Sequence, residues 1–235
     1  MARSVELDFT DEVVVVTGAA GTLGTAVVEQ FTAAGATVCA TDIVEENDVD
    51  ALPKRAQFYQ ADFTDESSVV QAYETMKDDH GEFDALCSIA GMWQGGTPIQ
   101  ETSIDTFEQL FAVNLRTLFL AAKHAIPSLQ RTNGSIVAVS ARASLEGGEG
   151  DGPYRAAKAG VRRIIETIAE EQSGELRANA VMPSVIDTPA NRNAMEDADY
   201  EKWVDPADIA ETIAVLCSPA TTVTSGAAIP VYGEA

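Results

Sequence analysis

The chain has 235 residues, 46% of them hydrophobic, with 37 aspartates and glutamates against 15 lysines and arginines. This length suits one large α/β domain with a substantial core, and no shift of composition divides the chain. The formal net charge of −22 disfavours binding to nucleic acid or to an anionic membrane surface.

Export, membrane insertion and metal binding are not indicated. Residues 1–12 are acidic and lack the apolar core of a signal peptide, and no apolar run approaches the roughly 18 residues of a membrane span. Three cysteines (Cys39, Cys87 and Cys217) are widely spaced among apolar neighbours, and two histidines (His80 and His124) are isolated. They predict reduced core thiols rather than a disulfide framework or a metal site. We therefore expect a soluble cytoplasmic protein without bound metal.

The hydrophobic pattern alternates between strands and helices along the whole chain. Strands are expected at 13–17, 36–42, 57–61, 83–90, 135–140, 177–182 and 227–231. Helices are expected at 25–34, 65–79, 104–129, 154–171 and 206–217. This order predicts an α/β fold with a doubly wound parallel sheet of about seven strands flanked by helices. The irregular stretches 146–152 and 183–205 are long enough to be active-site loops.

Three glycines, Gly18, Gly21 and Gly24, lie between the first strand and the first helix. Glycine lets the backbone approach a pyrophosphate, and a helix N-terminus offers free N–H groups. The spacing differs from G-x-G-x-x-G, so a plain tight turn is the alternative. Asp42 ends the second strand about 20 residues later, where a carboxylate binds a ribose hydroxyl pair and repels a 2′-phosphate. Because no Lys or Arg lies between Gly18 and Ile43, the sequence favours NAD(H) over NADP(H).

Polar or small residues follow two more strands and interrupt one helix. Asp62, followed by Phe63, is placed to bind an adenine amino group, unless it belongs to a helix cap. Ala90 and Gly91 are small enough to let a cofactor approach the backbone. Asn114 lies among apolar residues and therefore needs hydrogen-bond partners, either structural or functional.

Tyr154 and Lys158 stand four residues apart, just after the glycine-rich loop. If Pro153 opens a helix, the two side chains lie one turn apart on the same face. A lysine charge lowers the pKa of a neighbouring phenol from about 10, which suits proton transfer near neutral pH. Taken alone, the pair is better explained as an exposed aromatic and a solvated lysine.

Together, these positions resemble the short-chain dehydrogenase/reductase family over nearly the whole chain. The matching positions are Thr17 to Gly24, Asp42, Asp62, Ala90, Gly91, Asn114, Tyr154 and Lys158. The resemblance implies one Rossmann-type NAD(P)-binding domain over 1–235, with substrate loops near 91–103, 141–153 and 183–205. It implies that Tyr154 is the general acid or base, that Lys158 binds the nicotinamide ribose, and that Asn114 supports a helix bend and a water relay. It also implies a homodimer or homotetramer paired through two long helices.

The same resemblance assigns the cofactor and substrate contacts. Cofactor contacts are expected at Gly18, Gly21, Thr22, Leu23, Gly24, Asp42, Ile43, Asp62, Phe63, Ala90, Gly91, Tyr154, Lys158, Pro183, Val185, Ile186 and Thr188. Residues 187–189 match the segment that clamps the nicotinamide carboxamide, with Thr188 the expected contact. Trp93 either stacks on a flat substrate ring or plugs a loop. A flap over the substrate, or else a surface helix, is expected from Asn191, Arg192, Met195 and Trp203.

One position departs from the family pattern. The serine that hydrogen-bonds the substrate oxygen is replaced by Ala141, and Ser140 and Ser144 are the alternatives. An alanine there, together with Trp93 and the stretch 183–192, resembles the dihydropteridine reductase subgroup, which uses NADH. The chain differs from that subgroup in having Asn114.

Three functions are therefore open. The first is NADH-dependent reduction of a planar, quinonoid or imine-like small molecule, with Tyr154 donating the proton. The second is an ordinary carbonyl reductase or alcohol dehydrogenase in which Ser140 or Ser144 supplies the missing hydroxyl. The third is a non-catalytic NAD-binding regulator, although the intact Tyr154 and Lys158 favour an enzyme.

The acidic composition predicts a halophilic protein that is stabilised by salt. Repulsion among carboxylates is screened within about 3 Å at molar ionic strength. We expect the free energy of unfolding to rise from dilute buffer to molar potassium chloride, as measured by denaturant unfolding. Full stability in dilute buffer would contradict this hypothesis.

Overall fold

Seven parallel strands form one sheet in a computed structural model that describes residues 7–46 and 53–234. The strands are β1 (Val13–Thr17), β2 (Thr37–Asp42), β3 (Ala56–Gln60), β4 (Ala85–Ser88), β5 (Ser135–Val139), β6 (Arg177–Pro183) and β7 (Ala228–Val231). Their spatial order is β3-β2-β1-β4-β5-β6-β7, which confirms the predicted doubly wound sheet. The order reverses between β1 and β4, and ligands of such sheets bind at this switch point.

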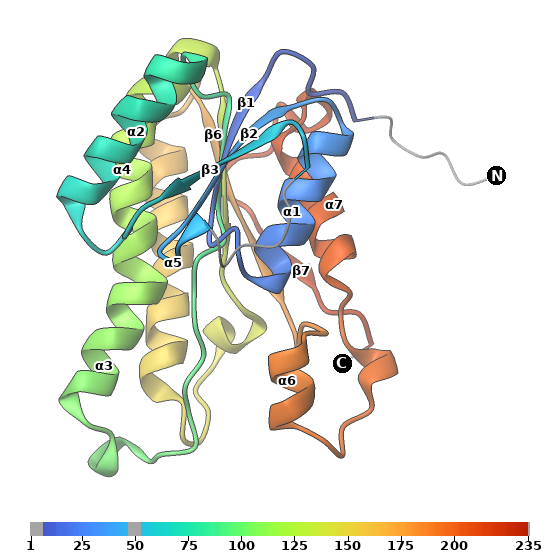
Figure 1. Cartoon of the computed structure of the whole chain (residues 1–235). Coiled ribbons are helices and arrows are strands. Elements are labelled where there is room, and N and C mark those ends of the chain that lie inside the picture. The colour runs from blue at the N-terminus through green and yellow to red at the C-terminus, as the bar shows by residue number, and fades with distance from the viewer. Residues whose placement is uncertain (1–6, 47–52, 235) are drawn as a thin grey trace.

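Helices cover both faces of the sheet (Figure 1). α1 (Thr22–Ala33) and α7 (Pro206–Cys217) pack on one face. α2 (Glu66–His80), α4 (Thr117–Thr132) and α5 (Gly152–Glu171) pack on the other. β1, β4 and β5 are buried along their whole length, which explains why their sequences are apolar without alternation.

The expected helix 104–129 is helical along its whole length but contains a π-helical turn. α3 (Ile104–Phe111) is followed by a π-helical turn at Ala112–Arg116, and only then does α4 begin. Asn114 lies in this turn and donates from Nδ2 to the carbonyl of Leu110, at 3.0 Å, and to Met92 O, at 2.9 Å. Its side chain therefore bonds a carbonyl of the preceding turn, and wide turns of this kind often mark functional sites.

Two other boundaries differ from the expected ones. β4 ends at Ser88 instead of 90, because the N–H groups of Ile89 and Ala90 turn to Thr17 Oγ1 at 3.2 and 3.3 Å. The stretch expected to be irregular at 183–205 contains the short helix α6 (Pro189–Ala194). Thr188 caps this helix and Pro189 suits its first turn.

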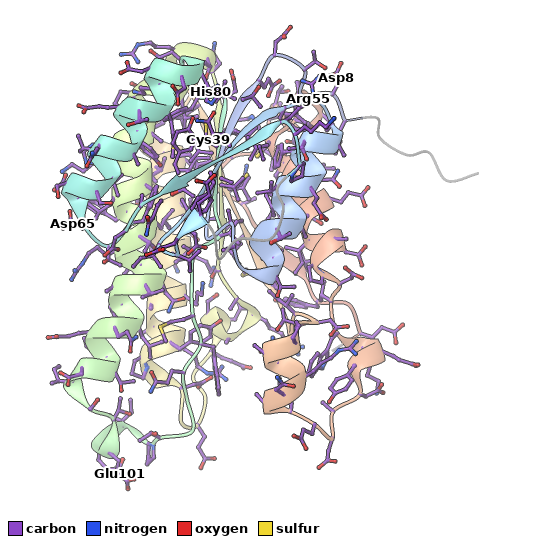
Figure 2. All side chains as sticks on the ribbon, in the orientation of Figure 1. Asp8, Cys39, Arg55, Asp65, His80 and Glu101 are labelled. Atoms are coloured by element: carbon purple, nitrogen blue, oxygen red, sulfur yellow. The ribbon has the colours of Figure 1, made fainter. Side chains whose placement is uncertain are left out.

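The cysteines lie in the core as predicted: all three are buried and free. Figure 2 shows Cys39 and His80 at the end of the molecule opposite Glu101. The Nε2 atom of His80 lies 2.9 Å from the hydroxyl of Tyr59. In residues 7–46 and 53–234, no group of three His, Cys, Asp or Glu side chains could hold a metal ion. No helix of the same ranges is both long and apolar enough to cross a membrane.

Candidate active site

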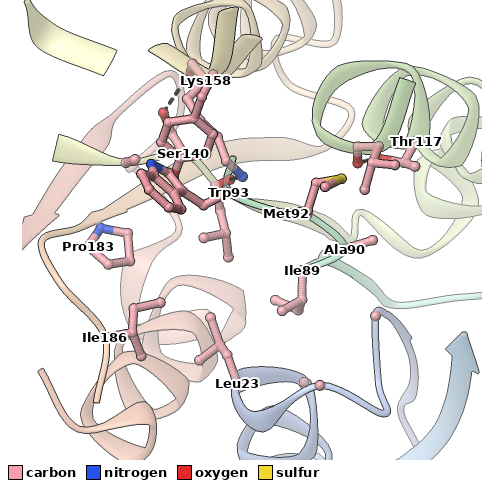
Figure 3. Close-up of a pocket in the computed structure, with 18 of the residues that line it drawn as sticks. Leu23, Ile89, Ala90, Met92, Trp93, Thr117, Ser140, Lys158, Pro183 and Ile186 are labelled. Carbon is pink, nitrogen blue, oxygen red and sulfur yellow. Dashed lines mark hydrogen bonds between the residues drawn. The ribbon is translucent and has the colours of Figure 1, made fainter. Parts of the chain in front are cut away.

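A cavity of about 930 Å³ opens where β1, β4, β5 and β6 end (Figure 3). The residues that follow these strands line it, among them Gly18, Ala90, Ser140 and Ser184. In Figure 3, Leu23 lies across this space from Lys158. The cavity therefore lies at the switch point of the sheet, where an elongated ligand can run along the strand ends.

The turn between β1 and α1 leaves its backbone open to this cavity. Gly18 has φ +69°, and a Cβ there would lie 2.7 Å from the Cα of Ala90. A Cβ on Gly24 would lie 2.0 Å from the carbonyl oxygen of Gly18. Gly21 begins α1 without any side-chain cap, so the first helical turn keeps unbonded N–H groups toward the cavity. These residues fit the pyrophosphate of a dinucleotide.

Two carboxylates line the end of the cavity nearest β2 and β3. Asp42 accepts hydrogen bonds from the N–H of Ala20 at 3.1 Å and from the N–H of Ile43 at 2.7 Å. Asp62 accepts from the N–H and the hydroxyl of Thr64 at 2.8 and 2.7 Å. Asp65 caps α2, and the N–H of Asp62 donates to the hydroxyl of Ser68 in that helix, so Asp62 lies in the cap region and also lines the cavity. Both carboxylates are held by short local bonds and stay in the cavity wall.

Lys158 is buried at the other end, with an exposed fraction of 4%. Its Nζ donates to the carbonyl of Val139 at 3.0 Å, and a Cβ on Gly91 would lie 3.0 Å from it. Burial lowers the pKa of Lys158 to about 8, because the charged form is disfavoured away from water. Tyr154 lines the same cavity, with its ring centroid 6.0 Å from the lysine nitrogen.

The expectation that Lys158 lowers the phenol pKa is wrong for this arrangement. Burial, with a smaller contribution from the Asp151 carboxylate, raises the pKa of Tyr154 to about 12. The Lys158 ammonium donates to the carbonyl of Val139 at 3.0 Å and lies 6.0 Å from the centroid of the phenol ring, and its charge does not offset the burial. The phenol therefore keeps its proton at neutral pH.

Asn114 holds the backbone next to this pair. It accepts from the N–H of Met92 at 3.1 Å and donates to the carbonyl of the same residue at 2.9 Å. A Cβ on Gly91 would lie 2.9 Å from Asn114 Oδ1, so only glycine fits between Asn114 and Lys158. Asn114 therefore fixes the start of the loop that carries Trp93.

Neither serine alternative presents its hydroxyl to the cavity. Ser140 lines the cavity but donates its hydroxyl to the main-chain oxygen of Lys158 at 2.8 Å (Figure 3). Ser144 is buried, and its Oγ lies 3.9 Å from the sulfur of Met182. Ala141 also lines the cavity, and its side chain offers only a methyl group.

The predicted substrate residues divide into two groups. Trp93 lines the cavity with 58% of its surface exposed, and Gly95 lies directly against its ring. Asn191 and Met195 also line the cavity. Trp203 does not line it, because its ring packs edge-on against Tyr200 at 4.8 Å. This packing agrees with the alternative of a surface segment for Trp203, and its role toward a substrate stays a prediction.

Three further expected contacts lie outside the cavity wall. Thr22 is exposed at the first turn of α1. Thr188 accepts the N–H of Asn191 at 3.1 Å as the cap of α6. Arg192 forms a paired salt bridge with Asp187 at 2.6 and 2.7 Å instead of covering the substrate. The other expected cofactor positions, Pro183, Val185 and Ile186 among them, do line the cavity.

Charged residues that the sequence did not single out also line the cavity. They are Arg142, Glu146, Asp151 and Arg155. Arg155 pairs with Asp151 at 2.5 Å and donates to the carbonyl of Glu146 at 3.2 Å. The four-residue spacing of Asp151 and Arg155 was the available signal for this pair, since such residues are neighbours on a helix.

Comparisons with known protein sequences match this chain to oxidoreductases. A family model described as Enoyl-(Acyl carrier protein) reductase matches residues 18–233. The chain is 30% identical to 3-oxoacyl-(acyl-carrier-protein) reductase FabG of Thermotoga maritima, over 94% of this chain and 96% of that protein. It is 32% identical to meso-2,3-butanediol dehydrogenase of Serratia marcescens, over 97% and 95% of the two chains.

Solved structures of similar fold also include a short-chain dehydrogenase/reductase. A short-chain dehydrogenase/reductase of Brucella melitensis, described as glucose/ribitol dehydrogenase, superimposes with a TM-score of 0.90 at 27% identity. The match covers 97% of this chain and 98% of that one. The chain belongs to the short-chain dehydrogenase/reductase family of oxidoreductases.

Proposed function

We propose that the protein is an NAD(H)-dependent reductase of a planar, quinonoid or imine-like small molecule, similar to dihydropteridine reductase, with Tyr154 as proton donor. The observation that carries the proposal is the methyl group of Ala141 in the cavity wall, together with the Ser140 hydroxyl turned to Lys158 O. A quinonoid ring is already polarised, so its reduction needs less localised stabilisation of an oxyanion than reduction of a ketone.

The cofactor proposal rests on the lining of the cavity. The turn from Gly18 to Gly24 would hold the pyrophosphate, and Asp42 would hold the adenosine ribose. Lys158 would hold the nicotinamide ribose at the other end. When bound, the nicotinamide ring supplies or accepts the hydride. Asp42 would repel a 2′-phosphate, which supports NAD(H) over NADP(H).

The proposed role of Tyr154 as proton donor rests on the opposite pKa shifts of Tyr154 and Lys158. The phenol of Tyr154, with its pKa raised to about 12, keeps its proton at neutral pH and can donate it to the reduced substrate. Lys158, with its pKa lowered to about 8, is mostly charged at neutral pH. Its positive charge then stabilises the phenolate left when the proton departs.

The substrate class is supported by Trp93. Its ring is largely exposed in the cavity wall and supported from behind by Gly95. A flat indole stacks well on a flat heterocycle. The neighbouring Asp151 and Arg155 neutralise each other, so this wall suits a ring with no large net charge.

A second function is favoured by the names of the relatives. The Serratia marcescens protein is a butanediol dehydrogenase, which suggests a secondary alcohol or ketone as substrate. Tyr154 would then hold the substrate oxygen without help from Ser140 or Ser144. A non-catalytic NAD-binding regulator is the third possibility, and it predicts cofactor binding without turnover.

We also propose that the protein acts in the cytoplasm as a homodimer or homotetramer. The support is a set of exposed apolar side chains on α3 and α4, namely Ile104, Phe107 and Phe119, with exposed fractions of 65%, 40% and 51%. Apolar side chains of this size are often covered in an assembly. Their position agrees with pairing through the helices that follow β4.

A substrate panel with one substitution separates the first two functions. We expect wild type to oxidise NADH with quinonoid dihydropterin much faster than with small cyclic ketones. Ala141→Ser should raise ketone turnover by about 10-fold or more, because it adds one oxyanion donor, and should change the dihydropterin rate little. Ala143→Ser, which adds a hydroxyl to the same wall two residues away, is the matched control.

Three outcomes would overturn the proposal. Faster ketone than dihydropterin turnover by wild type would favour the second function. NADH binding with no turnover of any panel member would favour the regulator. An Ala141→Ser variant no better with ketones than Ala143→Ser would remove the argument from the missing hydroxyl.

The cofactor preference predicts the effect of removing one carboxylate. Asp42→Ala should weaken NADH binding and narrow the preference for NADH over NADPH, because it removes both the ribose acceptor and the repulsion of the 2′-phosphate. Glu45→Gln removes a charge from the same region without touching the cavity wall, and should keep the preference. Dissociation constants from NADH and NADPH fluorescence test this, and equal affinities in wild type would refute the NAD(H) assignment.

A further inference from the structure

We propose that Tyr232 is a positioning residue for the substrate side of the cavity. Tyr232 belongs to the segment 231–234, which begins at the last residue of β7 and which we call the strap. The strap joins three separate parts of the cavity wall: the loop after β5, the loop after β6, and the flap, defined as residues 186–204. The kinetic part of this inference rests on the proposed function, whereas the structural part does not.

The first tie runs to the base of the flap. Ile186 and Val204 form a parallel bridge that closes the flap, with the N–H of Asp187 donating to the carbonyl of Val204 at 2.9 Å. The N–H of Glu234 in the strap donates to the carbonyl of Lys202, two residues before that bridge, at 3.2 Å. The strap therefore bonds to the returning end of the flap.

Gly233 makes this approach possible. It has φ +57°, a conformation that glycine adopts without strain. A Cβ there would lie 3.0 Å from the carbonyl oxygen of Lys202 and 3.4 Å from the Cγ2 of Val204. Gly233, which has no side chain, therefore lets the strap pass close to Lys202 and Val204 at the end of the flap.

The second tie runs to the other end of the flap, where the chain leaves β6. The N–H of Ser184 donates to the carbonyl of Val231 at 3.2 Å, and its hydroxyl donates to the carbonyl of Tyr232 at 2.6 Å. Ser184 lines the cavity. The chain that enters the flap and the end that returns from it are therefore both bonded to the same four-residue segment.

The third tie runs to the loop after β5. The guanidinium carbon of Arg142 lies 5.1 Å from the ring centroid of Tyr232, within the range of a cation–π contact. Arg142 lines the cavity and directly follows Ala141. Tyr232 itself does not line the cavity, so its influence on a substrate passes through the residues that it holds.

These ties place Tyr232 where it can set the distance between opposite walls. Its ring supports Arg142 in the loop after β5, and its main-chain oxygen holds Ser184, two residues before the flap that carries Asn191 and Met195. Asp42 ends β2, near the opposite edge of the sheet from β7, where the strap begins. Loss of the ring should therefore weaken substrate binding and leave cofactor binding nearly unchanged.

The test compares Tyr232→Leu with Tyr232→Phe in the full chain. Tyr232→Leu removes the ring, and we expect a two- to fivefold higher KM for the acceptor substrate, as for loss of one partly exposed cation–π contact. We expect little change in kcat or in the dissociation constant of NADH. Tyr232→Phe keeps the ring and should restore the wild-type KM.

Hydrogen exchange of the flap amides provides a readout that does not depend on turnover. We expect faster exchange at 186–204 in Tyr232→Leu and in Ser184→Ala, which removes only the 2.6 Å bond to the strap. If wild type turns over no acceptor, the proposed function fails while the exchange data still decide the role of the strap. Unchanged flap exchange in both variants, or a KM in Tyr232→Leu equal to that of wild type, would overturn the inference.

Discussion

The buried ammonium of Lys158 is the group on which the rest of the cavity depends. A buried cation must be satisfied by the protein, and here the carbonyl of Val139 at the end of β5 accepts its hydrogen bond at 3.0 Å. The Ser140 hydroxyl holds the main-chain oxygen of the same lysine, which fixes α5 against the strand ends. The absence of a side chain at Gly91 leaves space for both the ammonium and Asn114.

Burial acts on the two neighbouring groups in opposite directions, because it disfavours the charged form of each. It lowers the pKa of Lys158 to about 8 and raises the pKa of Tyr154 to about 12. The result is a protonated phenol beside a lysine whose charge is lost slightly above neutral pH. Under the proposed function this phenol donates the proton, and Ala141 offers it no hydroxyl partner.

The sequence was a good guide wherever one local pattern decided the structure. Continuous apolar runs such as Val13–Thr17 predicted the strands, and Tyr154 and Lys158 predicted a shared helical face. The sequence was a poor guide where contacts between residues distant in the chain determine the structure. Asn114 bonds Met92 from within a π-helical turn, Trp203 packs on Tyr200, and burial reverses the expected pKa shift of Tyr154. Periodicity carries no information about such partners or about desolvation.

The most direct test of this account is the pH dependence of kcat/KM for NADH, which reports the ionisations of the free enzyme. Because the pKa of Lys158 is lowered to about 8, the lysine is charged below that pH and neutral above it. The account predicts a plateau at lower pH and a decline above about pH 8, with Tyr154 protonated throughout. A value of kcat/KM for NADH that stays constant well above pH 8 would contradict this account.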